Sequence, residues 1–327
     1  MVAPGDFGLC QWFHHDDDAR LAQAVHLLRD LGVRQLRTGI SWADLHRPGG
    51  RDWYDRMFAA LAGVEGLSLL VSLWHTPPSI SANGRTNGPP MRDGRVDPSL
   101  FSEAIWEVCD RWGRHFDEIE LWNEPNNRLK WDFVEADPGW HLFDDMLAHG
   151  AGAARLAGKR TVLGGVALGS PSWIADRRTA GALEEVDVLA IHAFPGLWSP
   201  LHPRHNWEWL SEWRGWPAKI AAIRNLADGR PVYVTEAGFA TWDPEAGRPT
   251  AARERAQASR LAEAAAAPAD RLYWYSLLDL DPKRPSLPQS FGEENESEHH
   301  CGLVRADGTA KPALGVLRLA LPVSAGP

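Results

Sequence analysis

Two glutamates stand at the ends of apolar segments that have the pattern of buried strands. Glu124 lies in the segment WNEPN at Trp122–Asn126, and Glu236 lies in the segment VTEAG at Val234–Gly238. Two carboxyl groups can share the work of breaking a bond, because one donates a proton to a leaving oxygen while the other attacks as a nucleophile. That chemistry requires both groups to face one opening, although they lie far apart in the chain.

The apolar pattern of the chain predicts elements that can bring them together. Short apolar runs alternate with longer stretches of helical periodicity, eight times in succession and without a linker. We therefore predict an α/β protein with a single (β/α)8 TIM barrel over residues 1–327. Helices are expected to begin at Asp97 and Asp137, each of which precedes a proline. The predicted strands are 7–12, 35–39, 67–74, 118–122, 161–168, 186–192, 231–235 and 271–278.

The two glutamates occupy equivalent places in this predicted barrel. Glu124 ends strand 4 and Glu236 ends strand 7. An active site on this fold lies where the strands end, because the loops from strand to helix open there. We expect the two carboxylates about 5 to 5.5 Å apart, which is the separation used in retaining glycoside hydrolysis.

Five residues on neighbouring strands are predicted to bind the substrate or support the acids. Arg37 can keep the nucleophilic carboxylate ionised, because a nearby positive charge favours the charged form. His192 is expected to orient that nucleophile, and Asn123 to hydrogen-bond a sugar 2-hydroxyl. His75 is expected to reach another sugar hydroxyl, and the apolar plate of Trp274 to form the floor of the sugar site.

These segments resemble clan A of the glycoside hydrolases, and WNEPN is most similar to family 39. That family contains β-xylosidases, α-L-iduronidases and bacterial exopolysaccharide hydrolases. The resemblance spans Phe7 to about Leu319 and implies a retaining double displacement without metal or cofactor. It implies that Glu124 is the acid/base, kept protonated by its surroundings, and that Glu236 is the nucleophile. It also implies supporting roles for Arg37, Asn123, His192 and Trp274, and a glycoside, oligosaccharide or polysaccharide as the substrate.

Long polar loops are expected to border the site. They occupy residues 79–97 and 281–300, after strands 3 and 8. Loops of this length in a compact domain are typically functional, and these can close one end of a cleft and impose exo action. The acidic residues of the second loop are interpreted as a solvated face, namely Glu293, Glu294, Glu296 and Glu298.

Tryptophan is unusually frequent, with 17 in the chain and a dense group in residues 198–216. Trp209, Trp213 and Trp216 have the spacing of a helical core stripe. Trp198 lies nearer the end of strand 6 and is the better candidate for a sugar platform.

Two short clusters contain metal-ligand residue types. One is His14–Asp18 after strand 1, and the other is His299–Cys301 before the last turn. The acids of the first cluster are interpreted as caps of the first helix. The second cluster is interpreted as the segment that leads from the long loop after strand 8 back to the last turn. We therefore predict no metal site and no cofactor.

Charge and composition exclude several classes of partner. The formal net charge is -9 and the chain has no lysine- or arginine-rich run, so we expect no nucleic-acid partner. The sequence has no signal-peptide pattern and no apolar run long enough to span a membrane. Three scattered cysteines, Cys10, Cys109 and Cys301, are typical of a reducing compartment, so a cytoplasmic protein is expected.

Other activities are compatible with the same residues. An acceptor sugar in place of water would make the protein a transglycosylase. A barrel that binds carbohydrate without turnover would bind sugars and release no product, and a metal-dependent sugar isomerase or hydrolase would be inhibited by a chelator. The residues assign neither the sugar, the linkage nor an oligomeric state.

Overall fold

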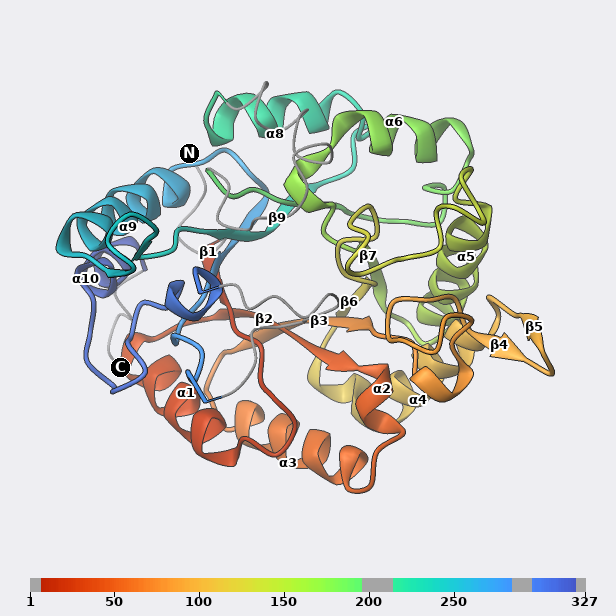
Figure 1. The fold of residues 1–327 in the computed structure, drawn as a ribbon, viewed down its shortest axis with the longest axis horizontal. Coiled ribbons are helices and arrows are strands. Elements are labelled where there is room, and N and C mark those ends of the chain that lie inside the picture. Colours follow the sequence, from red (N-terminus) through yellow and green to blue (C-terminus); the bar gives the residue numbers. More distant parts are fainter. Residues whose placement is uncertain (1–6, 196–213, 284–295, 322–327) are drawn as a thin grey trace.

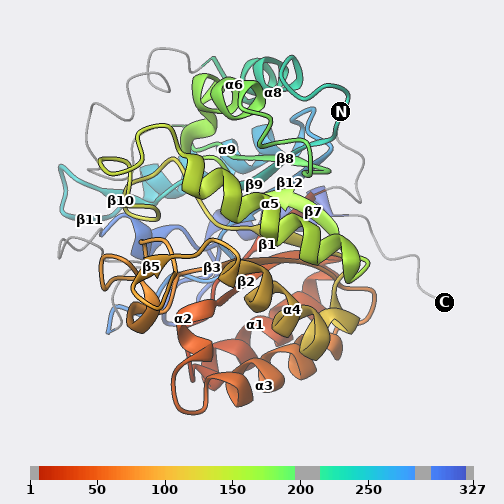
Figure 2. The ribbon, with the colours of Figure 1, turned by 90° about the vertical axis from the view of Figure 1, so that its right-hand side faces the viewer.

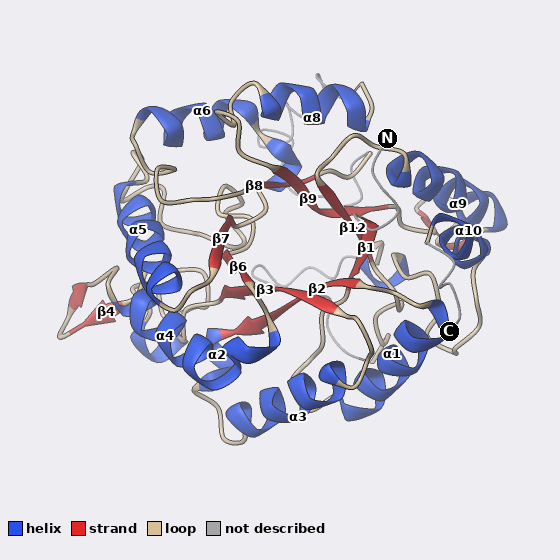
Figure 3. Cartoon of the chain, turned by 180° about the vertical axis from the view of Figure 1, so that it is seen from behind, coloured by secondary structure: helices blue, strands red, loops and turns tan. Residues whose placement is uncertain are grey.

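Eight parallel strands form the centre of the molecule. The computed structural model describes residues 7–195, 214–283 and 296–321. The strands follow the order β7-β6-β3-β2-β1-β12-β9-β8, and backbone pairing of Val162 with Val188 and of Val166 with Ile191 joins the outer two. Figures 1 and 3 show the resulting ring, which confirms the predicted (β/α)8 barrel. The strands are β1 (Phe7–Cys10), β2 (Gln35–Ser41), β3 (Ser68–Trp74), β6 (Glu118–Leu121), β7 (Arg160–Leu163), β8 (Leu189–His192), β9 (Val232–Gly238) and β12 (Arg271–Tyr275).

Helices surround the barrel, and two short hairpins extend from it. The hairpins are β4 (Met91–Arg92) with β5 (Arg95–Val96), and β10 (Trp242–Asp243) with β11 (Arg248–Pro249). They follow β3 and β9, and Figure 2 shows both on the same side of the barrel. The helices are α1 (Asp18–Leu31), α2 (Trp42–Leu45), α3 (Gly50–Ala62), α4 (Leu100–Trp112), α5 (His141–Leu156), α6 (Pro171–Thr179), α8 (Trp216–Arg224), α9 (Ala251–Ala265) and α10 (Pro312–Ala320).

Both faces of the strands are buried, which explains their nearly continuous apolar sequences. A large core fills the layer between strands and helices, and contains Leu272 and Trp274 of β12. A smaller core contains Tyr273 and Tyr275 of the same strand, together with Cys10. Because successive side chains of a strand point to opposite faces, the smaller core belongs to the barrel interior.

The fifth barrel strand ends earlier than predicted, at Leu163 instead of residue 168. A Cβ atom at Gly164 would lie 2.6 Å from the backbone of Trp122, and one at Gly165 would lie 2.2 Å from Nε2 of His192. The two glycines therefore let the chain pass close to the carboxyl ends of the neighbouring strands.

The two predicted helix starts are displaced. Helix α4 begins at Leu100 and α5 at His141. The carboxylate of Asp97 accepts a hydrogen bond from the backbone N–H of Ser99, and that of Asp137 accepts one from Leu142. Asp97 thus stabilises the turn that precedes α4, and Asp137 the first turn of α5, because each side chain offers an acceptor to nearby backbone N–H groups.

Candidate functional site

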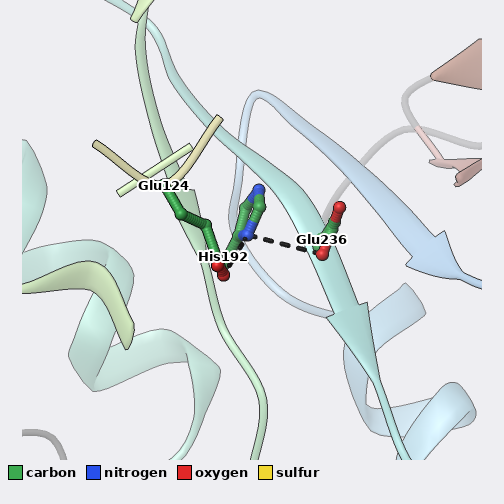
Figure 4. Close-up of side chains that lie close together, drawn as sticks. All are labelled: Glu124, His192 and Glu236. Carbon is green, nitrogen blue, oxygen red and sulfur yellow. Dashed lines mark hydrogen bonds and ion pairs between the residues drawn. The ribbon is translucent and has the colours of Figure 1, made fainter. Parts of the chain in front are cut away.

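Glu124 and Glu236 meet at the carboxyl end of the barrel. Figure 4 shows their side chains on either side of His192. One carboxylate oxygen of each glutamate and one ring nitrogen of His192 all lie within 4.8 Å of one another. The distances from His192 Nδ1 are 2.9 Å to Glu124 Oε1 and 3.4 Å to Glu236 Oε2. The sequence-based expectation that strands 4 and 7 bring two acids to one opening agrees with this geometry.

Glu236 is held mainly by one of its two oxygens. Its Oε1 accepts a hydrogen bond of 2.6 Å from Arg37 Nη1 and one of 3.1 Å from the indole N–H of Trp12. The thiol of Cys10 lies 3.9 Å from the same atom. Arg37 therefore contacts Glu236 as predicted, whereas Trp12 and Cys10 were not identified from the sequence.

Arg37 links Glu236 to Asn123. Its side chain is completely buried, and it donates hydrogen bonds to Glu120 Oε2 at 2.7 Å and to Asn123 Oδ1 at 2.8 Å. Burial disfavours the charge of Arg37, but Glu120 and the neighbouring acidic groups outweigh that effect and raise its pKa. The guanidinium is thus a fixed positive charge that holds three side chains in register.

The backbone at the end of β6 places Glu124 by an uncommon conformation. Trp122 and Glu124 both have positive φ angles, of 77° and 48°. The backbone N–H of Glu124 donates to Gly165 O at 3.1 Å, and its Oε2 accepts a hydrogen bond of 2.8 Å from Asn127. This turn of the chain directs the carboxyl group back over the barrel opening.

The surroundings of Glu124 favour its charged form. Burial raises the pKa of this carboxyl, but the hydrogen bond and charge of His192, the charge of Lys130 and the hydrogen bond from Asn127 outweigh burial and lower the pKa to about 2. The expectation that the surroundings keep Glu124 protonated is therefore wrong for the free site. The described partners of this carboxyl are donors or cations, which stabilise a carboxylate.

His192 lies closer to Glu124 than to Glu236, the residue that it was predicted to orient. Its Nε2 is buried and has no hydrogen-bond partner among the described residues, so its polar contacts run through Nδ1. Nδ1 lies near both glutamates, and its shorter contact is the one to Glu124.

Trp274 does not lie where the sequence analysis placed it. Its side chain is completely buried in the core between the strands and the helices. The alternation along β12 turns Tyr273 and Tyr275 toward the barrel interior and Trp274 away from it. The prediction that Trp274 forms the floor of a sugar site is therefore wrong.

His75 follows β3 and makes no described hydrogen bond with either glutamate. Its ring stacks on Trp74 with centroids 3.5 Å apart, and its Nδ1 lies 3.3 Å from Ser41 Oγ. Burial and the charge of Lys130 lower the pKa of His75, so the ring is neutral at neutral pH. Its contact with a sugar hydroxyl stays a prediction.

Two ionisable residues that the sequence analysis did not assign to the site lie beside it. Lys130 is buried, and its Nζ lies 4.9 Å from the ring centre of Trp74. Glu298 is also buried, and it accepts a hydrogen bond of 3.3 Å from the hydroxyl of Tyr275. Lys130 and Glu298 interact electrostatically with each other and with both catalytic candidates.

The interpretation of Glu298 as part of a solvated acidic face is wrong. The chain after β12 folds back as a short helical turn at Glu298–His300, and this turn buries the carboxyl beside Tyr275. Glu293 and Glu294 lie outside the described residues, as do Trp198, Trp209 and Trp213. No periodic sequence signal distinguishes Glu298 from its exposed neighbours.

The pH dependence of stability should report on Glu298. Burial raises its pKa to about 8, and Glu236 and Glu124 act in the same direction against the opposing charge of Lys130. An unfolded glutamate titrates near pH 4.3. The stabilising contribution of protonated Glu298 is therefore complete below about pH 4.3 and is lost as the pH rises toward 8. We expect the melting temperature of Glu298→Gln to fall less between pH 5 and pH 8 than that of the wild type.

Thermal unfolding across that pH range checks this expectation, with Glu263→Gln as the matched control. Glu263 is a half-exposed residue of α9 that pairs with Arg260 on the surface. The control should follow the wild-type curve. Parallel curves for Glu298→Gln and the wild type would contradict the assigned protonation state of Glu298.

Among the described residues, Glu124, His192 and Glu236 form the one group with the composition of a metal site. The His14–Asp18 segment is accounted for otherwise: Asp17 caps α1 by accepting from Arg20 N, and Asp16 and Asp18 pair with Arg56. In the second cluster, the ring of His300 stacks on Trp242, and the thiol of Cys301 donates to Ser297 O.

Solved structures with the same architecture are glycoside hydrolases. A family 39 enzyme from the gut symbiont Bacteroides cellulosilyticus WH2 matches with a TM-score of 0.63 at 18% identity. A monomeric beta-xylosidase from Caulobacter crescentus CB15 and a family 39 enzyme from Xanthomonas axonopodis pv. citri each match with a TM-score of 0.64, at 17% and 16% identity. The chain has the fold of family 39 glycoside hydrolases.

The match to this fold extends over nearly all of the chain. The three alignments cover 98%, 96% and 98% of it, but only 65%, 67% and 68% of the family 39 structures. The chain thus spans about two thirds of their length. Neither a family model nor a curated protein sequence matches the chain. None of the helices in the described ranges has the length and apolar character that a membrane span requires.

Proposed function

We propose that the protein is a retaining glycoside hydrolase in which Glu236 is the nucleophile and Glu124 is the acid/base. The observation that carries this proposal is the approach of the two carboxylates, whose nearest oxygens lie within 4.8 Å. Retaining enzymes place the two carboxyl groups about 5 to 5.5 Å apart, whereas inverting enzymes leave about 6.5 to 9.5 Å for a water molecule. The shared fold with family 39 enzymes supports the same reading.

The unequal surroundings of the two acids support the division of roles. Arg37 holds Glu236 by a charge-assisted hydrogen bond, which favours the carboxylate needed for attack. Glu124 has no arginine partner among the described residues, and its Oε1 contacts a histidine that can exchange a proton. The nucleophile thus has a fixed cation, and the acid/base has a proton-sharing partner.

In the first half-reaction, Glu236 attacks the anomeric carbon while the bond from that carbon to the leaving oxygen breaks. Glu124 must supply a proton to this oxygen, although the free site favours its carboxylate. The imidazolium form of His192 carries a proton on each ring nitrogen, and transfer of the Nδ1 proton to Glu124 Oε1 across 2.9 Å leaves a neutral histidine protonated on Nε2 and a carboxylic acid. A sugar that displaces water from the site favours this neutral form, because low dielectric disfavours separated charges.

In the second half-reaction, Glu124 removes a proton from water, and the resulting attack on the anomeric carbon breaks its bond to Glu236. The product keeps the anomeric configuration of the substrate because two inversions have occurred. Asn123 is suited to bind a sugar hydroxyl at this stage, since Arg37 occupies its Oδ1 and leaves its amide N–H groups available.

Hydrolysis of a panel of aryl β-glycosides and α-L-arabinosides, with the anomer of the first product followed by proton NMR, tests the proposal. We expect one or more substrates to be cleaved with initial release of the anomer present in the substrate. Release of the opposite anomer would indicate an inverting mechanism. Binding of sugars without any cleavage would favour a carbohydrate-binding barrel.

Zinc should inhibit the enzyme, and chelator should not. Zn²⁺ prefers nitrogen and oxygen ligands at about 2.0 to 2.1 Å in a tetrahedral arrangement, which places neighbouring ligand atoms roughly 3.3 Å apart. The contacts of His192 Nδ1 with the two glutamates, at 2.9 and 3.4 Å, are close to that spacing. An ion bound there would occupy both catalytic carboxylates.

Initial rates with increasing Zn²⁺ measure this effect, and Mg²⁺ is the control because it prefers octahedral oxygen sites. We expect Zn²⁺ inhibition that chelator reverses, little effect of Mg²⁺, and full activity of untreated enzyme in chelator. Loss of activity in chelator alone, restored by added metal, would favour a metal-dependent reaction instead.

A further inference from the structure

An aromatic residue outside the predicted set contacts the proposed nucleophile directly. Trp12 lies just past the end of β1, after Gln11, and is half-buried. Its indole N–H donates to Glu236 Oε1 at 3.1 Å. From this contact we infer that Trp12 is a positioning residue of the reaction, which fixes the rotation of the Glu236 carboxylate and leaves Oε2 as the attacking oxygen.

The donors around Glu236 are distributed asymmetrically. Arg37, Trp12 and Cys10 all approach Oε1, whereas Oε2 is on the side of His192, 3.4 Å from its Nδ1. Burial raises the pKa of the Cys10 thiol well above its ordinary value, so this group stays protonated and can act only as a weak donor. An oxygen with three donors is less available for bond formation than one that faces the acid/base, so attack by Oε2 is favoured.

Arg37 alone would leave the carboxylate free to turn about its single hydrogen bond. Trp12 adds a second donor, which reaches Oε1 from the segment that follows β1. Two donors from rigid elements define an orientation, because rotation of the carboxylate must then break at least one charge-assisted hydrogen bond. The inference rests on the proposed function, since it assigns Trp12 a role in the same displacement.

The barrel wall accommodates the indole in one place. A Cβ atom at Gly39 of β2 would lie 2.1 Å from Cζ3 of Trp12, so the missing side chain of Gly39 makes room for the ring. On other sides the ring packs against Trp74, with centroids 5.6 Å apart, and against the Arg37 guanidinium, 4.9 Å from its centre. These contacts restrict the ring and thereby direct its N–H toward Glu236.

Two substitutions separate the hydrogen bond from the packing of the ring. Trp12→Phe keeps an aromatic plane and removes the donor. Trp12→His removes the six-membered ring but keeps a five-membered ring whose Nε2 superposes on the indole Nε1. We expect Trp12→Phe to lower the rate of formation of the glycosyl-enzyme about 10- to 100-fold with KM little changed, which is the size of a hydrogen bond to a charged group. In Trp12→His, assayed above pH 7.5, the rate of formation of the glycosyl-enzyme should fall by less than about tenfold.

The rate of the first step is measured with a 2-deoxy-2-fluoro glycoside, whose covalent adduct accumulates and is counted by mass spectrometry. Trp106→Phe is the control, because Trp106 lies on α4 and is 44% exposed. It should match the wild type. If the rate of the first step falls equally in Trp12→His and Trp12→Phe, the packing of the ring matters and its N–H does not, which would overturn the inference. A wild-type rate in Trp12→Phe would overturn it as well.

A spectroscopic measurement is independent of turnover. In protein labelled with ¹⁵N-tryptophan, the indole N–H signal of Trp12 is identified by its loss in Trp12→Phe. We expect this signal to move upfield in Glu236→Gln, because a neutral amide is a weaker acceptor than a carboxylate. An unmoved signal would overturn the hydrogen bond itself. A moved signal together with an inactive wild type would refute the proposed function instead.

Discussion

Glu236→Gln should abolish turnover of every glycoside that the wild type cleaves, with kcat/KM reduced by roughly 10⁴-fold or more. The amide has nearly the shape of the carboxylate and keeps an oxygen for Arg37 and Trp12, but it cannot form the covalent intermediate. The loss should therefore appear in kcat, with sugar binding retained. Steady-state kinetics together with isothermal titration of an unreactive sugar measure the two effects separately.

The anomer formed by a rescued variant identifies the face that Glu236 occupies. In Glu236→Ala, azide can enter the space left by the carboxylate and attack the anomeric carbon directly, which gives a glycosyl azide of inverted configuration. Glu263→Gln, a surface substitution on α9, should behave as the wild type in both assays. Turnover by Glu236→Gln within tenfold of the wild type would assign the nucleophile to another residue.

Glu124→Ala should lose activity to an extent that depends on the leaving group. An acidic phenol leaves without protonation, so its first step should be slowed little and the second step, which needs a general base, should limit the rate. A poorly acidic leaving group needs the proton, and its cleavage should fall about 10²- to 10⁴-fold, the usual contribution of general acid catalysis. A series of aryl glycosides with leaving groups of graded pKa measures this slope.

Azide distinguishes the role of Glu124 from that of Glu236. Added azide should accelerate the second step in Glu124→Ala and give a glycosyl azide of retained configuration, because it attacks the intermediate without base assistance. Asn127→Ala is an informative comparison, since Asn127 donates to Glu124 Oε2 at 2.8 Å and its removal should affect the rate only moderately. A loss in Glu124→Ala that is the same for all leaving groups would contradict the role of acid.

The positions of the two glutamates could be predicted because they depend on the ends of strands. Parallel strands of a barrel all end at one rim, so a residue that follows β6 and one near the end of β9 lie at the same opening. Arg37 and Asn123 were also predicted from the sequence, and in the structure Arg37 donates hydrogen bonds to Glu120, Glu236 and Asn123.

The sequence did not show which aromatic residue of β12 faces the site. Side chains alternate along a strand, and the sequence did not indicate which alternate set points into the barrel. Every residue of β12 is aromatic or aliphatic from Leu272 to Tyr275, so the alternation carries no polar marker of the inner face. Trp274 points to the helices and Tyr275 to the interior. Trp12 lies just past the end of β1, where the strand period no longer predicts direction.

Residues on loops were the least predictable part of the site. Lys130 reaches Trp74 only because the chain after β6 folds back over the barrel, with Trp122 Nε1 donating to Lys130 O. Glu298 reaches Tyr275 through the short turn before Cys301. Both contacts join segments distant in the chain, and neither leaves a local periodic signal.

The sequence by itself determined the barrel, the number of its strands and the two acids at its rim, because hydrophobic periodicity and strand ends are local properties that the chain carries directly. Only the tertiary structure decided which side chains contact those acids and whether these contacts favour the charged or the neutral form. The hydrogen bond between His192 and Glu124, the donors on Glu236 Oε1 and the burial of Glu298 all result from contacts between strands and loops. Electrostatic energies depend on such distances and on burial, which no local pattern specifies.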